Sequence, residues 1–523
     1  QVLFAERAEF GNYSTNIPFL LVKELKKSPM EIAKELAEKI VLQQAQEQKK
    51  LFSKVEAAAP GYVNFWLSPE TLIKELERVL KAKNYKAPPI GRQIKAKSLK
   101  INIEFISANP TGPLTMANGR GGFLGDVLGN ILEAVGHKVV REYYINDAGN
   151  QIRLLGESIL AALGKISAKE EHYKGEYIKI LAEKLKLKIL RQAQDDGAES
   201  IGRLVAAELL KQIKKSVGNV GIKFNVWYSE YENLRGEKGL IKKVLAILEK
   251  GGLVEKKEGA VWLKTSDISE DKDRVLIKSD GQPTYFLADL AYHYDKLIKR
   301  KFDLAIDIWG ADHHGYMKRL ALGIKELGVD PKRLKIIITQ LVRLVEGGKE
   351  VKMSKRTGEF VTLDELVKEV GNKDAVRFFF LTHTPETHMD FDLALAKEKS
   401  QKNPVYYIQY AYVRAFNILK KSKIIKHQAS SIKKLNNESE THLLSELVKL
   451  PHIIRQTAED YQVSRLARYA MELARAFHNF YEKERVIDEK GNVDKNKLAL
   501  VLAAKNIFEK TFRIIGIEAP EKM

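Results

Sequence analysis

The stretch that decides the fold is Ile101-Asn-Ile-Glu-Phe-Ile-Ser-Ala-Asn-Pro-Thr-Gly-Pro-Leu-Thr-Met-Ala-Asn118, followed by Gly119-Arg-Gly-Gly-Phe-Leu-Gly-Asp126. Residues 101–106 alternate well enough to predict a short strand. The loop at 109–113 contains two prolines, which stiffen it, and one glycine, which lets it turn. Apolar residues then recur at helical spacing from Phe123 to Val135, and Gly136 is expected to end the helix.

A second strand is predicted from His137 to Ile145, so the whole run reads as strand, loop, helix and strand. This order predicts a parallel βαβ unit, whose helix N-terminus points at whatever lies above the strand ends. An anion such as a nucleotide phosphate would bind there. The pattern alone fits an ordinary βαβ crossover about as well.

Two distant stretches favour the nucleotide-binding interpretation. Lys352-Met-Ser-Lys-Arg356 lies in a polar, glycine-flanked stretch, and Tyr285-Phe-Leu-Ala-Asp289 lies on a helical segment. With these stretches placed together and in this order, the chain resembles the class I aminoacyl-tRNA synthetases, and specifically the arginyl-tRNA synthetases. The resemblance covers nearly the whole chain and extends to Glu9-Phe-Gly-Asn-Tyr-Ser-Thr-Asn16, Arg141-Glu-Tyr-Tyr-Ile-Asn-Asp-Ala-Gly149, Gly310-Ala-Asp-His-His-Gly315, Asn403-Pro-Val-Tyr-Tyr-Ile-Gln-Tyr-Ala-Tyr-Val-Arg414 and Ala519-Pro-Glu-Lys-Met523.

The composition is that of a soluble globular chain. Its 523 residues are enough for three or four domains, and 44% of them are apolar. No apolar run approaches the roughly 20 residues of a membrane span, and no signal peptide is visible. The absence of cysteine excludes disulfides, thiolate zinc sites and thiol catalysis. The chain begins with Gln1 rather than Met, so we expect that it lacks a short leader or is a fragment.

The charge balance is strongly basic. Lys and Arg number 88 against 68 Asp and Glu, which gives a formal net charge of +20. This excess suits a polyanionic partner, because neutralising phosphates releases counterions. General solubility is the alternative explanation.

Residues 1–95 are predicted to form a small α/β domain. Ser28-Pro-Met-Glu31 is a capping box with proline at the first helical position, and the helix is expected to reach Ile40. Residues 61–67 predict a strand with Val63, Phe65 and Leu67 on one face. The resemblance implies that this domain contacts the outer corner of tRNA, whereas a structural appendage would show the same pattern.

The rest of the chain divides into two further predicted domains. After a basic linker at 81–100, residues 96–395 are expected to form the Rossmann-type catalytic domain of an α/β class I synthetase. A polar, mostly helical insertion at about 151–270 interrupts it, and the resemblance makes this the connective region that holds the tRNA acceptor end. The sheet is expected to resume at 302–309 and 335–339. Residues 396–523 are predicted to be an all-α bundle, which the resemblance makes the anticodon-binding domain.

The reaction that the resemblance implies has two steps. The carboxylate of L-arginine attacks the α-phosphorus of ATP, and a ribose hydroxyl at the 3′ end of tRNA(Arg) then attacks the adenylate. The first step requires donors and cations around the phosphates. The family supplies two histidines in a His-x-Gly-His run, but here Thr115 and Asn118 stand at those positions. Neither can become cationic, so the site would depend more on Lys352 and Lys355, with Arg356 as a further candidate. It would also depend on Mg²⁺ that enters with ATP and on the helix N-terminus.

The resemblance also assigns the binding residues. Catalytic roles fall to Thr115, Asn118, Lys352 and Lys355, the two lysines lying on a loop that closes over the triphosphate. ATP-binding roles fall to Thr111, Gly112, Pro113, Asn118, Gly310, Asp312, His314, Lys352 and Lys355. Arginine-binding roles fall to Glu104, Asn109, Tyr285, Asp289 and His313.

The acidic residues suit an arginine side chain. Tyr285 and Asp289 are four residues apart and share a helix face, although such a pair is more often structural. With Glu104 they could accept the fork of a guanidinium, and lysine, citrulline or glutamine would leave acceptors or charges unmatched. Asp312 beside two histidines could suggest a metal site, but neighbouring side chains diverge and no third ligand is near, so no structural metal is expected.

In the C-terminal bundle, Tyr407, Tyr410 and Arg414 fall on one helix face. Such a stripe is usually core, but the resemblance places it at the tRNA anticodon, where bases could stack on it. Two alternatives remain: a non-catalytic tRNA-binding relative with a degenerate nucleotide site, and another adenylating enzyme of this fold. The resemblance further implies a cytoplasmic monomer.

Overall fold

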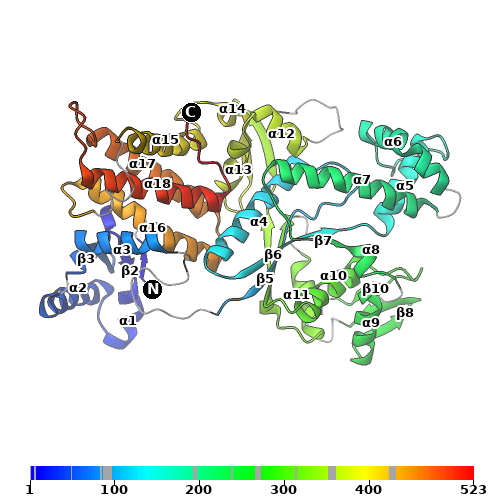
Figure 1. Ribbon diagram of the computed structural model, residues 1–523. Coiled ribbons are helices and arrows are strands. Elements are labelled where there is room, and N and C mark those ends of the chain that lie inside the picture. The colour runs from blue at the N-terminus through cyan, green and yellow to red at the C-terminus, as the bar shows by residue number, and fades with distance from the viewer. Residues whose placement is uncertain are drawn as a thin grey trace. The chain divides into compact units, whose positions relative to one another are not determined.

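The computed structural model describes residues 2–4, 8–48, 50–82, 85, 97–192, 197–236, 239–264, 272–311, 315–351, 361–422 and 432–523. The chain divides into two compact units (Figure 1). The first comprises residues 1–96, 399–461 and 465–523, and the second comprises 97–398 with 462–464. None of the described helices is long and apolar enough to cross a membrane.

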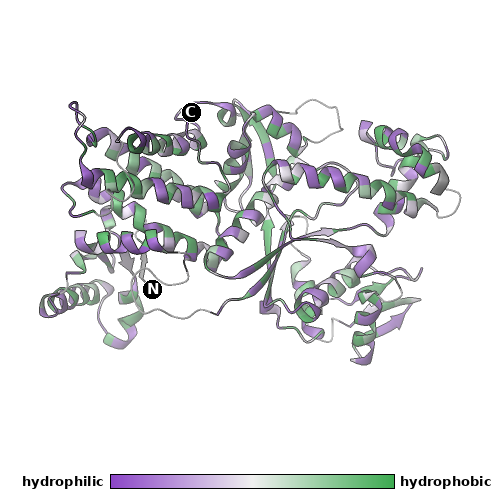
Figure 2. Cartoon of the chain, in the orientation of Figure 1, coloured by the Kyte–Doolittle hydropathy of each residue, from purple (hydrophilic) through white to green (hydrophobic). Residues whose placement is uncertain are grey.

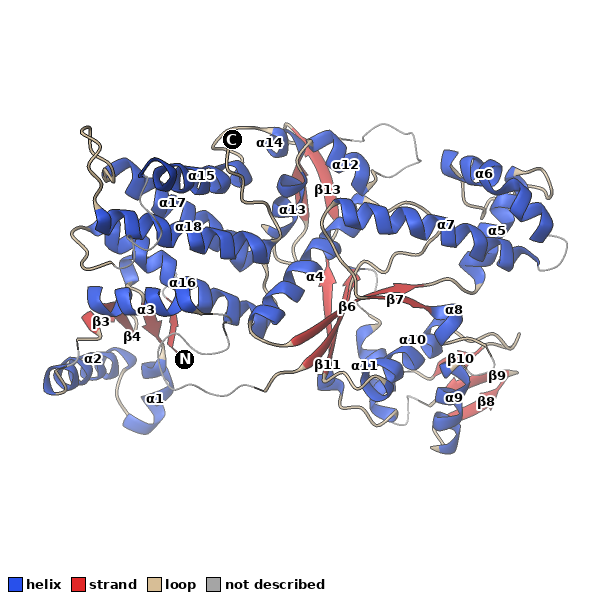
Figure 3. Cartoon of the chain, viewed as in Figure 1, coloured by secondary structure: helices blue, strands red, loops and turns tan. Residues whose placement is uncertain are grey.

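A five-stranded parallel sheet organises the second unit (red in Figure 3). Its strand order is β12-β11-β5-β6-β7. The bounds are β5 Lys100–Glu104, β6 Lys138–Ile145, β7 Val226–Ser229, β11 Leu304–Gly310 and β12 Leu334–Thr339. The predicted Rossmann-type α/β fold class is therefore confirmed, including both strands expected after residue 300.

The predicted βαβ unit is also confirmed. Helix α4, Met116–Ala134, connects the parallel neighbours β5 and β6, and Gly136 follows it with a φ of 88°. The helix lies close against the sheet, since a Cβ on Gly125 would stand 2.3 Å from Cγ of Phe105. Only glycine fits this approach.

The strand order creates a reversal at the centre of the sheet. The chain starts at β5, adds β6 and β7 on one side, and then returns to add β11 and β12 on the other. The reversal lies between β5 and β11. In parallel α/β sheets, ligands bind beyond the carboxyl ends of the strands at such a point.

The stretch at 151–270 contains strands as well as helices. Helices α5, α6 and α7 span Asn150–Ala162, Glu176–Gln192 and Gly197–Asn219. The chain then returns to the main sheet as β7, so a strand of the sheet lies inside the expected insertion. After it come α8 Glu230–Asn233, α9 Leu240–Lys250 and an antiparallel sheet of β8 Val254–Lys257, β9 Ala260–Leu263 and β10 Arg274–Ile277.

The remaining described elements of this unit are helices and one small sheet. Helix α10, Tyr285–Tyr294, runs directly into a π-helical turn at Asp295–Lys299. Its apolar side packs with α9 and with α11, Met317–Glu326, in one hydrophobic cluster. The other elements are β13 Val342–Glu346, β14 Lys349–Glu350, α12 Leu363–Val370, α13 Lys373–Leu381, β15 Met389–Asp392 and α14 Leu393–Lys397.

The first unit combines a small sheet with a helical bundle. Strands β1 Val2–Phe4, β2 Tyr13–Thr15, β3 Phe52–Ala58 and β4 Tyr62–Leu67 form an antiparallel sheet with α1 Ile17–Leu25, α2 Pro29–Gln46 and α3 Pro69–Lys81. The capping box of Ser28 and Glu31 is confirmed, and α2 continues six residues beyond the predicted Ile40.

The C-terminal part is all-helical in its long elements, as predicted. The bundle comprises α15 Pro404–Ser422, α16 Glu438–Asp460, α17 Ser464–Lys483 and α18 Lys495–Ile515. These helices carry hydrophilic and hydrophobic faces (Figure 2). The apolar faces bury residues such as Leu447, Phe477 and Phe508, which stabilises the bundle.

Candidate active site

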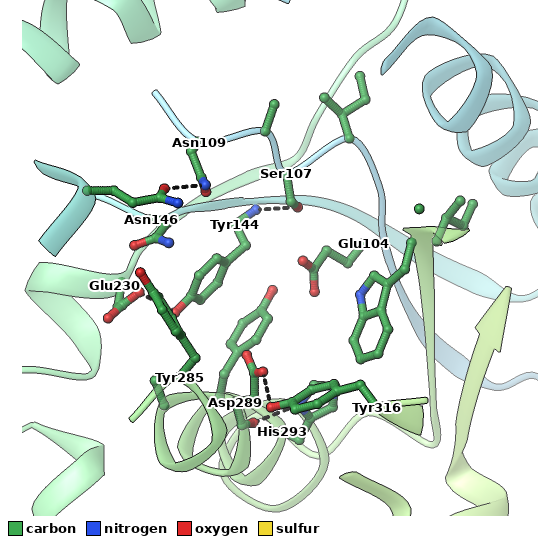
Figure 4. Close-up of a pocket in the computed structure, with 18 residues that line it drawn as sticks. Glu104, Ser107, Asn109, Tyr144, Asn146, Glu230, Tyr285, Asp289, His293 and Tyr316 are labelled. Carbon is green, nitrogen blue, oxygen red and sulfur yellow. Dashed lines mark hydrogen bonds between the residues drawn. The ribbon is translucent and has the colours of Figure 1, made fainter. Parts of the chain in front are cut away.

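A cavity of about 460 Å³ lies at the reversal point of the sheet (Figure 4). Glu104 is the last residue of β5 and Gly310 is the last residue of β11, and both line the cavity. Helix α10 contributes Tyr285 and Asp289. The other polar lining residues are Ser107, Asn109, Tyr144, Asn146, Gln151, Glu230, Tyr292, His293 and Tyr316.

The backbone after β5 is strained where it enters the cavity. Ile106 and Ser107 have φ angles of 66° and 39°, which side-chain-bearing residues rarely adopt. The hydroxyl oxygen of Ser107 accepts the backbone N–H of Tyr144 at 3.0 Å, which fixes this turn against β6. Strained turns of this kind concentrate at functional sites.

Three carboxylates face the cavity, and two of them have cationic partners. Glu104 accepts a hydrogen bond from Nζ of Lys296 at 2.6 Å. Glu230 accepts one from Nε of Arg235 at 2.7 Å. Asp289 accepts only a neutral donor among the described residues, the hydroxyl of Tyr316 at 2.5 Å.

The electrostatics of Asp289 therefore favour a cationic ligand. Burial is the main cause that raises the pKa of Asp289 to about 6. The charges of Glu104 and Glu230 act in the same direction, while the Tyr316 hydroxyl and His293 oppose the rise. A shift of about two pKa units means that ionising this carboxyl in the folded protein costs roughly 3 kcal/mol more than in water. A bound cation would remove this cost.

Amide groups line the neighbouring part of the cavity. Nδ2 of Asn109 donates to Oε1 of Gln151. The amide of Asn146, in the orientation that satisfies its neighbours, donates to Oε2 of Glu230 at 3.1 Å. Neutral amides can both donate and accept, so this wall suits the α-amino and carboxylate groups of an amino acid.

The structure brings together most of the predicted arginine-binding residues. Glu104, Asn109, Tyr285 and Asp289 line one cavity, together with the predicted ATP-binding residue Gly310. Five predicted site residues fall outside the described parts of the chain: Asp312, His313, His314, Lys352 and Lys355.

The residues at the start of α4 are engaged in capping the helix. Oδ1 of Asn118 accepts the backbone N–H of Thr115 at 2.8 Å and the Thr115 hydroxyl at 3.0 Å. The proton of the Thr115 hydroxyl is therefore already donated, and the amide NH₂ of Asn118 is the donor that remains.

The segment after the Lys352 stretch is anchored at the same helix start. The carbonyl of Val361 accepts the backbone N–H of Met116 at 2.8 Å, and Thr362 forms a bridge with Thr115. In the preceding loop, the carbonyl of Thr111 accepts the hydroxyl of Tyr177 on α6 at 2.9 Å. The described residues that follow the Lys352 stretch thus contact the start of α4, and the loop before α4 contacts α6.

Among the cavity residues that the sequence did not predict are Tyr144, Gln151, Glu230 and Tyr316. Glu230 directly follows β7, and a carboxylate at a strand end is a signal that could have identified it. The others reach the cavity only through tertiary packing, and no local pattern marks them.

In the bundle, the three predicted tRNA-binding residues form one cluster on α15. The guanidinium carbon of Arg414 lies 4.5 Å from the ring centroid of Tyr410 and 4.5 Å from that of Tyr481. The ring of Tyr407 lies 4.6 Å from that of His478 on α17. Tyr407, Tyr410 and Arg414 are half-buried, so this helix face is neither a closed core nor a fully open surface.

Three family models match the chain. The model of "tRNA synthetases class I (R), catalytic domain" matches residues 89–379. The "Arginyl tRNA synthetase N terminal domain" matches residues 2–67, and the "DALR anticodon binding domain" matches residues 408–523.

Similar proteins and solved structures agree with these family models. An arginine–tRNA ligase of Carboxydothermus hydrogenoformans is 42% identical over 98% of this chain and 92% of its own length. One of Thermotoga maritima is 38% identical over 100% of this chain and 96% of its own. The arginyl-tRNA synthetase structure of Thermus thermophilus has a TM-score of 0.77 at 22% identity, covering 100% of this chain and 96% of that one, and supports the fold alone.

The parallel sheet, the cavity at its reversal point and the match of the catalytic domain define a class I aminoacyl-tRNA synthetase. Within that class, the acidic cavity and the matches at both ends of the chain point to the arginyl-tRNA synthetases in particular. The chain belongs to the arginyl-tRNA synthetase family.

Proposed function

We propose that the chain joins L-arginine to the 3′ end of its tRNA at the expense of ATP, through an arginyl-adenylate. One observation carries the substrate assignment: Glu104 and Asp289 face the same cavity, and Asp289 has no cationic partner among the described residues. A guanidinium offers five N–H donors and a permanent positive charge. It would pair with both carboxylates and remove the cost of ionising Asp289.

The rest of the cavity orients the reacting end of the amino acid. We infer that Asn109, with Gln151 beside it, holds the α-amino and carboxylate groups, so that the carboxylate faces the ATP site near the start of α4. Positioning of this kind is the main contribution that a synthetase makes, because the protein forms no covalent bond with the substrate.

Charge development on the phosphates requires donors that are already in place. We assign this role to the N-terminus of α4, the amide of Asn118, and the ammonium groups of Lys352 and Lys355. Thr111, Gly112, Pro113, Gly310, Asp312 and His314 would hold the nucleotide. Mg²⁺ would enter on the ATP phosphates, as it does when substrate oxygens supply most of its ligands.

The tRNA would contact both ends of the chain. We assign the outer corner of the tRNA to residues 1–95 and the anticodon to residues 396–523, where Tyr407, Tyr410 and Arg414 offer aromatic and guanidinium planes for unstacked bases. The net charge of +20 favours such a polyanion. We expect the protein to act as a monomer in the cytoplasm.

A charging assay tests this function. The purified protein, ATP, Mg²⁺ and bulk bacterial tRNA should transfer radiolabelled arginine to acid-insoluble tRNA, and lysine or citrulline should not be transferred. Binding of tRNA without transfer of arginine would instead support the non-catalytic alternative, which no comparison favours.

A further inference from the structure

Three carboxylates stand side by side beneath the cavity. Asp307 on β11 is the direct strand partner of Glu104 on β5, and Glu104 is the direct partner of Glu142 on β6. Asp307 and Glu142 are fully buried, and Glu104 is 6% exposed. Like charges on directly opposed residues repel, so this row is stable only if nearby groups neutralise it.

One short segment supplies the groups that neutralise the row. The Tyr292 hydroxyl donates to Glu142 at 2.6 Å, and Nε2 of His293 lies 2.7 Å from Asp307. Arg300 donates from its NH2 group to Glu142 at 2.7 Å. All of these residues come from α10 and the turn after it.

Lys296 is the central member of this segment. Its Nζ lies 2.6 Å from Oε2 of Glu104 and 2.8 Å from Oδ1 of Asp307, and its side chain is 0% exposed. It sits on the π-helical turn Asp295–Lys299, a conformation that is rare and frequent at functional sites. Lys299, on the same turn, has a side chain that is 60% exposed.

We propose that Lys296 is a positioning residue for the amino acid substrate: it holds Glu104 ionised and turned so that the second carboxylate oxygen is available to a guanidinium. Oε2 of Glu104 is taken by Lys296, whereas Oε1 accepts no hydrogen bond from any described residue. Figure 4 shows the Glu104 carboxylate pointing into the same space as Asp289. This inference rests on the proposed function and deepens it.

The charges around Glu104 explain why a lysine is needed. Burial raises the pKa of Glu104, and the charge of Asp307 raises it further, whereas Lys296 and His293 oppose the change. Lys296 makes the largest opposing contribution. Without it, Glu104 would take up a proton and lose its attraction for a guanidinium.

The test compares Lys296→Met with Lys299→Met, a matched control that removes an exposed lysine from the same turn. Initial rates of tRNA charging give the KM values for arginine and for ATP. Lys296→Met should raise the arginine KM at least about a hundredfold, which lies in the lower half of the range for loss of a buried charged partner, and should change the ATP KM less than threefold. Lys299→Met should change neither value more than twofold.

A double-mutant cycle separates a positioning role from general damage. If Lys296 acts through Glu104, Glu104→Gln/Lys296→Met should bind arginine no more weakly than Glu104→Gln alone. An unchanged arginine KM in Lys296→Met, or losses that add in full, would overturn the inference. If circular dichroism shows that Lys296→Met does not fold, Lys296→Gln replaces it, because glutamine keeps a hydrogen-bond donor without the charge. An arginine KM of Lys296→Gln equal to that of the unmodified protein would likewise overturn the inference. Charging by the unmodified protein tests the proposed function separately.

Discussion

Replacement of Asp289 by asparagine should change stability and substrate binding in opposite directions. The folded-state pKa of this carboxyl is about 6, above its ordinary value of 3.8. The folded protein therefore holds the proton more tightly than the unfolded chain. The stability that the protonated form contributes is present below pH 4 and is lost as the pH rises through about 6.

The magnitudes follow from this shift. At pH 7.5 the ionised carboxyl lowers the free energy of unfolding by about 3 kcal/mol, from roughly two pKa units. Asparagine removes the charge and can still accept the Tyr316 hydroxyl, so Asp289→Asn should recover most of that amount. The same change leaves a bound guanidinium without one of its partners, which costs about 3–5 kcal/mol. The dissociation constant for arginine should rise by about 10²-fold to roughly 4 × 10³-fold.

Denaturant unfolding and calorimetry measure the two quantities. Glu249→Gln, at an exposed carboxylate on α9, serves as the control and should change neither. The gain in stability of Asp289→Asn should shrink as the pH is lowered toward 4. Lower stability than the unmodified protein at pH 7.5, or unchanged arginine affinity, would refute the reasoning.

Three further results are expected. Arginine binding should weaken about tenfold per pH unit below pH 6 as Asp289 takes up its proton, and a flat calorimetric profile from pH 5 to 7.5 would contradict this. Lys355→Ala should slow pyrophosphate exchange, measured with tRNA present, about 10²–10³-fold, whereas an unaffected rate would exclude the lysine from the reaction. Gly125→Ala should destabilise the protein by about 1–3 kcal/mol, because its Cβ would lie 2.3 Å from Phe105. As a control, a Cβ added at Gly218 on α7 would meet nothing within 4 Å, so Gly218→Ala should stabilise the protein by about 0.5–1 kcal/mol. Equal changes in the free energy of unfolding for the two variants would disprove the packing argument.

The fold could be predicted where the deciding signals are local. The strand, loop and helix from residue 100 to 134 followed from apolar spacing, two prolines and a terminal glycine. Strand β7 was not identified, because four residues, Val226–Ser229, are too few to show alternation. Its place in the sheet is decided by pairing with β6, which is distant in sequence.

The site was predictable only in part for the same reason. Glu104 and Asp289 were identified through motifs, but Lys296 lies in a run of basic residues that is typical of a solvated surface. The π-helical turn directs it inward, and nothing in the spacing of Lys296, Lys299 and Arg300 predicts such a turn. Tyr316 likewise reaches Asp289 only because α10 and α11 pack together.

A crystal structure of the protein with L-arginine bound would test the central claim most directly. The guanidinium should lie between Glu104 and Asp289, with nitrogen atoms about 3 Å from an oxygen of each, and Lys296 should remain on the other oxygen of Glu104. A guanidinium that pairs with neither carboxylate, or an arginine bound outside this cavity, would contradict the account.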